Sequence, residues 1–238
     1  MIYPLAARRG MITPLARGIQ RADTSWWLAG GISAENCAAA YQAKGAASYV
    51  ASKVNLANPG TYNAVEVAAP SWDIASGWDA TAGGKLLLSN CGFKFGNNYS
   101  MAVRFSDSPN TDIRAVVGYR DITTAGIYHM DPGYYGQNDH QFSNQGISLV
   151  TGNYLPSGVM GMAGQRCFAN GVYEGALAIL VAAEINQIGI CNCTYGTSGD
   201  STGNIYKDSV SKIQAVVIYN TVITDEQMIA VQVAMAAI

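Results

Sequence analysis

The chain has 238 residues and a formal net charge of only −2, with 13% charged and 49% hydrophobic residues. A chain of this size can form one β-sandwich core, and its charged share is about half of the usual ~25%. This composition excludes an intrinsically disordered chain, and four clustered arginines are too few for a nucleic-acid-binding surface. Low charge with 26 Gly and 14 Tyr predicts a neutral surface rich in Tyr, Ser and Asn, which favours packing against other proteins.

An extended arm is predicted for residues 1–22, ahead of one folded domain at residues 23–238. Residues 1–6 recur almost unchanged as residues 11–16, and the proline in each copy disfavours a helix. Apolar anchors and arginines of this arm are predicted to bind a neighbouring subunit: Ile2, Pro4, Leu5, Arg8, Arg9, Ile12, Pro14, Leu15 and Arg17. A terminus without any partner is the alternative.

The five cysteines are an odd number, which argues against a fully paired secreted framework. We expect buried, reduced thiols in or beside strands. Prolines and arginines interrupt the apolar residues near the start, so no secretory signal is expected. No apolar run approaches the ~20 residues of a transmembrane helix, and membrane insertion is not expected.

Short strands separated by turns predict an all-β protein from residue 26 onward. Residues 99–105 alternate, which predicts a half-buried strand with Tyr99, Met101, Val103 and Phe105 on one face. Asn170-Gly171 between two apolar runs predicts a β-hairpin with a type I′ turn. Trp26 and Trp27 are expected to fix the entry of the chain into the sandwich.

Two segments are predicted to be helical. Residues 45–53 are rich in alanine and end near the turn-forming segment 58–60. Residues 224–227 read as a capping box, with Ile223 and Met228 placed to form a hydrophobic staple. This second helix is expected to lie against the sandwich.

Several segments resemble the laminin-G/concanavalin A-like jelly-roll domains of tailed-phage and prophage virion proteins. The similar segments lie at residues 39–48, 54–62, 72–78, 168–175 and 213–227. After Gly77-Trp78 the sequence departs from the family pattern. Residues 79–81 and residues 85–86 stand where the family usually has other residues. The resemblance implies an all-β, concanavalin A-like (laminin-G-like) jelly-roll β-sandwich with a short C-terminal α-helix.

The resemblance also implies a non-enzymatic structural or decoration protein of a phage virion. Its partners would be other virion proteins, attached at capsid or tail, and copies of itself. The alternative is a lectin-like module that binds host-surface glycans. An enzyme on this fold would need paired carboxylates across a cleft, and the sequence shows no strand with alternating acids, so we expect no catalysis.

Two ligand sites are candidates. Residues 128–140 combine stacked tyrosines with amides, which suits a sugar or a subunit contact, and a loop without a ligand is the third alternative. The candidate residues are Tyr128, His129, Tyr134, Tyr135 and Asn138. No cofactor is expected, and calcium held by oxygen ligands is the weaker alternative, with Asp107, Asp112 and Asp200 as candidates. Ordinary polar turns are the competing reading of these acidic loops.

Overall fold

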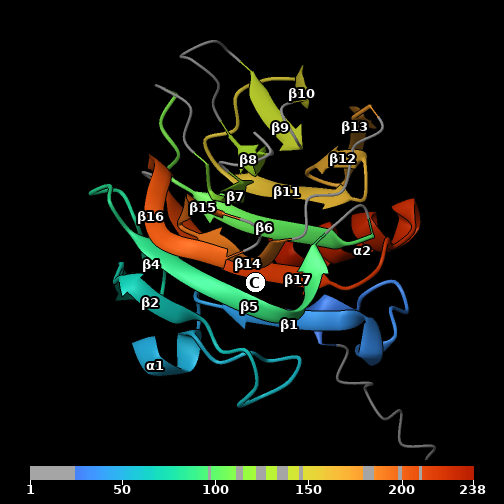
Figure 1. Ribbon diagram of the computed structural model, residues 1–238. Helices are drawn as coiled ribbons and strands as arrows, with labels where there is room; N and C mark the ends of the chain where they lie inside the picture. Colours follow the sequence, from blue (N-terminus) through green and yellow to red (C-terminus); the bar gives the residue numbers. More distant parts are fainter. Residues whose placement is uncertain are drawn as a thin grey trace, which may run out of the picture.

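The computed structural model describes residues 25–95, 98–110, 115–121, 127–132, 139–144, 147–178, 185–197, 200–208 and 211–238. The predicted arm therefore lies outside the described residues. Within them, the chain forms two β-sheets, two short 3₁₀ helices and two α-helices (Figure 1). No helix in the part of the chain that the structure describes has the length and hydropathy needed to cross a membrane.

The first sheet contains eight of the described strands. These are β1 (Cys37–Gln42), β3 (Ser71–Asp73), β4 (Gly77–Asp79), β6 (Ser100–Ser106), β11 (Gly158–Ala163), β12 (Arg166–Ala169), β13 (Val172–Ala176) and β17 (Lys212–Tyr219). They are ordered β13-β12-β11-β6-β17-β4-β3, and β1 pairs with the same edge of β17 as β4 does. All of these pairings are antiparallel.

The second sheet contains nine of the described strands. These are β2 (Val65–Ala68), β5 (Leu86–Phe95), β7 (Val117–Asp121), β8 (Ile127–Asp131), β9 (His140–Asn144), β10 (Ile147–Thr151), β14 (Ile185–Ile190), β15 (Asn192–Thr197) and β16 (Asp200–Asp208). The main path is β10-β9-β8-β7-β14-β5-β2, with β15 pairing to β7 and β16. Two facing sheets confirm the predicted sandwich.

The main core lies between the two sheets, and a second core lies outside the first sheet. Side chains at 99, 101, 103 and 105 all enter the main core, as the alternation predicts. The opposite face of β6 was expected to be exposed, but Ser100 and Ala102 are also buried. The helix α2 (Asp225–Ala236) packs over β11 and β6 and covers this face (Figure 1). The prediction of a half-buried strand was therefore wrong on that side.

The start of α2 is built as the sequence predicts. Thr224 Oγ1 accepts from Gln227 N, and Gln227 Oε1 accepts from Thr224 N, so the capping box is complete. Ile223 and Met228 are both buried in the core under the helix. Capping and burial together position α2 on the sheet.

The Asn170-Gly171 hairpin is also confirmed. Ala169 pairs with Val172 across the turn, and Asn170 and Gly171 have φ angles of 50° and 78°. Both positive angles are those of a type I′ turn. Asn170 Oδ1 also accepts from Val159 N, which ties the turn to β11.

The helix predicted at residues 45–53 is shorter than expected. Only α1 (Tyr49–Ser52) is helical, with Ser48 as its N-cap. Gly45 has a positive φ of 78° and donates its N–H to Ile74 O, so the alanine-rich segment before Ser48 does not form a helix.

Trp26 and Trp27 lie in the short 3₁₀ helix η1 (Trp26–Leu28) and pack at the second core. Trp26 Nε1 donates to Gln42 Oε1, and Tyr219 Oη donates to Trp27 O. These bonds fasten the entering chain to β1 and β17, as predicted.

Candidate functional site

An open cavity of about 280 Å³ lies where β1, β5 and the end of β17 meet the 3₁₀ helix η2 (Ala34–Asn36) and the loop before β2. Its described lining is Ala34, Glu35, Cys37, Ala38, Ala57, Asn58, Tyr62, Cys91, Gly92, Phe93 and Asn220. Its volume is close to the lower end of the roughly 300–1,000 Å³ found for small-molecule sites. We refer to it as the Tyr62 pocket.

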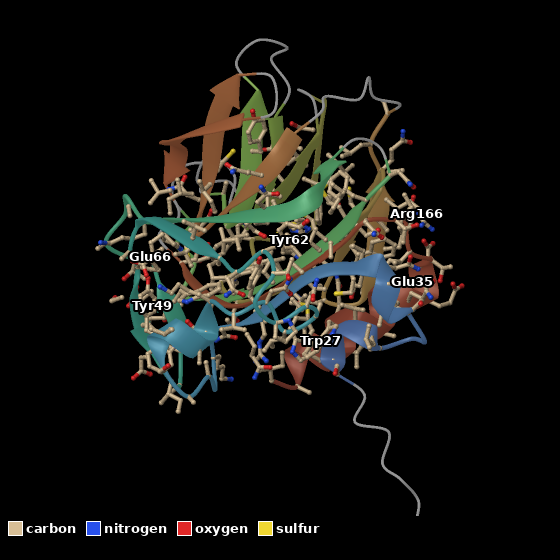
Figure 2. The ribbon with its side chains drawn as sticks, turned by 60° about the horizontal axis from the view of Figure 1, so that its bottom comes forward. Trp27, Glu35, Tyr49, Tyr62, Glu66 and Arg166 are labelled. Atoms are coloured by element: carbon tan, nitrogen blue, oxygen red, sulfur yellow. The ribbon has the colours of Figure 1, made fainter. Side chains whose placement is uncertain are left out.

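The rim of the Tyr62 pocket combines aromatic rings with hydrogen-bonding groups. Tyr62 is 41% exposed, and Phe93 is half-buried. Glu35, Asn58 and Asn220 are exposed and supply one carboxylate and two amides. Figure 2 shows Tyr62 near the middle of this face, with Glu35 to one side. A lining that combines aromatic rings with exposed polar residues can bind a polar ligand with apolar faces.

Tyr62 is held in an uncommon backbone conformation. Its φ is 55°, in the left-handed region that bulky residues rarely adopt. Tyr41 Oη donates to Tyr62 O at 2.5 Å and lies 2.6 Å from Ser89 Oγ, so the main core fixes the carbonyl of Tyr62. Such strain persists only where the surrounding structure imposes it, and it is concentrated at functional sites.

The ring of Tyr62 lies against Gly92 on β5. A Cβ atom built on Gly92 would be 2.1 Å from Tyr62 Oη, so only glycine leaves room for this ring. Gly92 also has a positive φ of 72°, and it lies where the pairing of β5 with β14 is irregular. The ring of Tyr62 therefore packs on the irregular part of β5.

Asn55 connects the loop that carries Tyr62 to β1. Its side chain is fully buried, and its Oδ1 accepts from the N–H groups of Ala40 and Ala57. Its Nδ2 donates to the carbonyls of Ala38 and Thr61, each at 3.0 Å. Four bonds from one side chain fix the loop position directly before Tyr62.

The opposite wall of the pocket is fixed by Asn220. Its N–H donates to Asn36 O at 3.0 Å, and its Nδ2 donates to Glu35 O at 3.3 Å. These bonds hold η2 against the end of β17. Glu35 and Asn220 are thus placed together although they are far apart in the sequence.

Two cysteines line the inner wall of the pocket. Burial raises the pKa of the Cys37 and Cys91 thiols to about 12. Both are therefore neutral thiols near pH 7 and poor nucleophiles. All five cysteines are buried and none forms a disulfide, which confirms the prediction of reduced thiols.

A second cavity, of about 270 Å³, lies between β6, β11, β17 and the end of α2. Arg104 is its cationic group, but its Nη1 donates to the carbonyls of Met235 and Ile238. The ring that lines it, Phe105, is 1% exposed. This cavity therefore offers no exposed aromatic face, and the Tyr62 pocket is the better candidate.

The predicted aromatic loop is only partly described. Tyr128 and His129 belong to β8, but their side chains are not described. Tyr134, Tyr135 and Asn138 lie wholly outside the described residues. His140, at the end of that segment, is 1% exposed, and its Nδ1 lies 2.9 Å from Asn153 O. This histidine therefore faces the interior.

Of the three calcium candidates, only the side chain of Asp107 is described, so the predicted site is not tested. Asp107 Oδ2 lies 2.6 Å from Lys212 Nζ, so the carboxylate of Asp107 is already paired with the ammonium group of this lysine. Asp112 and the side chain of Asp200 lie outside the described set, as do the arm residues 1–22. No three His, Cys, Asp or Glu side chains among the described residues gather into a metal-binding group.

No family model and no curated protein matches the chain. Among solved structures, this chain is similar to a Trypanosoma rangeli sialidase mutant that displays trans-sialidase activity, with a TM-score of 0.52 and 12% sequence identity. The match covers 84% of this chain and 33% of the sialidase chain. The sialidase in complex with sialic acid gives TM-score 0.50 with the same identity and coverage. Domain 4 of AbnA, a GH43 arabinanase from Geobacillus stearothermophilus, gives TM-score 0.48 at 12% identity over 83% and 98% of the two chains.

The chain spans about a third of the length of the sialidases it matches. At this identity the likeness shows the fold alone. It supports the β-sandwich, which is shared with domains of glycan-active proteins, and it shows no link to phage proteins.

Proposed function

We propose that this protein is a non-catalytic glycan-binding module and that the Tyr62 pocket is its binding site. The observation that carries the proposal is the exposed ring of Tyr62, held in a strained conformation at a pocket whose described lining also includes the exposed residues Glu35, Asn58 and Asn220. A sugar ring has an apolar face that packs on an aromatic ring, and hydroxyls that bond to such polar groups.

The neighbour solved in complex with sialic acid is consistent with this proposal, but the pocket carries it. The pocket differs from the aromatic loop that the sequence favoured. The virion structural role, the other sequence hypothesis, remains an untested prediction, since its arm lies outside the described residues.

Absence of catalysis is part of the proposal. Among the described residues that line the Tyr62 pocket, Glu35 is the one acidic residue, whereas glycoside hydrolysis commonly uses two carboxylates across the scissile bond. Its two thiols are neutral near pH 7 because burial raises their pKa, so neither serves as an activated nucleophile.

The test is a glycan array followed by calorimetry on the glycans that bind. Tyr62→Asn is the informative variant, because asparagine tolerates a positive φ while the ring is lost. Tyr173→Asn is the matched control, since Tyr173 is 49% exposed but lies on β13. We expect Tyr62→Asn to weaken binding about tenfold or more, as for an aromatic hot spot. Equal binding by both variants would refute the site.

A further inference from the structure

A chain of hydrogen bonds runs through the main core from the inner wall of the Tyr62 pocket to the backbone of Tyr62. Cys91 Sγ lies 3.2 Å from Ser89 Oγ, which lies 2.6 Å from Tyr41 Oη. Tyr41 Oη in turn donates to Tyr62 O at 2.5 Å. The two end residues, Cys91 and Tyr62, line the pocket. The two middle residues, Tyr41 and Ser89, are fully buried and are not part of its described lining.

The carbonyl group at the end of this chain fixes the direction of each hydrogen bond in it. A carbonyl oxygen only accepts, so the one hydroxyl proton of Tyr41 is committed to Tyr62 O. Tyr41 Oη must then accept from the hydroxyl of Ser89, and Ser89 Oγ must accept from the thiol of Cys91. Burial raises the pKa of Cys91 to about 12, so this thiol keeps its proton near pH 7. The chain therefore has one proton arrangement, with every donor directed towards Tyr62.

This arrangement holds the carbonyl of Tyr62 more firmly than an isolated hydrogen bond would. Hydrogen bonds in series polarise one another, and they are stronger in a buried environment than in water. The φ of 55° at Tyr62 is unfavourable for a bulky residue and persists only where the surroundings impose it. A fixed carbonyl opposes rotation of this backbone, and with it movement of the ring.

We propose that Tyr41 is a positioning residue of the glycan site, because its hydroxyl holds the Tyr62 ring in the orientation that receives a sugar. This inference rests on the proposed function. Tyr41 is fully buried and so acts through Tyr62, whose ring it keeps against Gly92 and open to solvent. Ser89 supports Tyr41 by donating the proton that Tyr41 Oη accepts.

Tyr41→Phe is the decisive variant, and Tyr219→Phe is its matched control. Tyr219 is also fully buried, and its hydroxyl also donates to a carbonyl, that of Trp27, at 2.8 Å. Both variants therefore lose a buried hydrogen bond from a tyrosine hydroxyl to a backbone carbonyl. The control bond fastens η1 to β17, whereas the bond of Tyr41 fastens the loop that carries Tyr62.

The first measurement needs no glycan. The ring of Tyr62 lies against Gly92, so its ring current shifts the Hα resonances of Gly92 in an NMR spectrum. We expect Tyr41→Phe to move these resonances towards their positions in Tyr62→Asn, which lacks the ring. Ser89→Ala should move them less in the same direction, and Tyr219→Phe should leave them unchanged. Ser89→Ala carries this test alone if Tyr41→Phe does not fold, and unchanged Gly92 resonances in the folded variants would overturn the proposal.

The second measurement is glycan affinity by calorimetry on the same preparations of the full chain. We expect Tyr41→Phe to weaken binding about fivefold, the equivalent of one hydrogen bond, and Tyr219→Phe to leave it unchanged. A ring that moves without any loss of affinity, or an equal loss in both variants, would overturn the positioning role. Absence of glycan binding by the wild-type protein, with the Gly92 resonances responding as expected, would instead overturn the proposed function.

Discussion

Replacing Asn55 with alanine is expected to destabilise the protein and to release the loop that carries Tyr62. The side chain of Asn55 makes four buried hydrogen bonds, two accepted and two donated, between β1 and this loop. At about 1 kcal/mol for each bond, their loss lowers the free energy of unfolding by about 4 kcal/mol. A domain of ordinary stability, about 5–15 kcal/mol, still folds after this loss.

The assay is equilibrium unfolding in guanidinium chloride, with glycan affinity measured on the same preparations. Asn63→Ala is the control, because Asn63 is exposed in the same loop and accepts one bond, from Asn55 N. It should cost about 1 kcal/mol or less. If Asn55→Ala costs as little as Asn63→Ala, the reasoning that Asn55 fixes the loop is wrong.

Three further outcomes are expected. Met228→Ala should lower the free energy of unfolding by about 2–5 kcal/mol in a denaturant melt, because Met228 is a fully buried residue of α2. A loss as small as that of Val233→Ala, at a position of α2 that is 62% exposed, would show that α2 is not part of the core. The folded-state pKa values of Cys37, Cys91 and Cys167 are raised by burial to about 12, so folded protein binds more protons and stability should fall above pH ~9, by up to about 1.4 kcal/mol per pH unit for each thiol. Melts from about pH 8 to about pH 11 check this, because this range begins below the ordinary thiol pKa of 9.0 and ends below the raised values. Rapid thiol labelling of native protein at about pH 8 would contradict it. The purified protein should hydrolyse no glycan of a broad panel, and turnover abolished by one carboxylate substitution would refute this.

Features set by neighbouring residues could be predicted from the sequence. The capping box at Thr224 and Gln227 and the turn at Asn170-Gly171 each depend on contacts within four residues, so the local pattern is sufficient. The helix predicted at residues 45–53 was too long because Gly45 takes a positive φ and bonds to Ile74, a contact that alanine content does not reveal.

The Tyr62 pocket could not be predicted in this way. Its lining comes from segments near residues 35, 60, 92 and 220, which only strand pairing brings together. The sequence identified residues 58–60 as a turn and noted 54–62 within the resembling segments, but it gave no sign that Tyr62 would be strained and exposed. Long-range pairing, and not local propensity, creates the site.

The most direct test of the glycan-binding account is to map, by amide chemical-shift perturbation, where a bound glycan contacts the protein. The account predicts concentration-dependent shifts at Asn58, Tyr62, Gly92 and Asn220, all of which line the same cavity, with little change at Gly171 in the distant hairpin. Shifts confined to residues 128–140, or no shifts with any glycan that binds on the array, would contradict it.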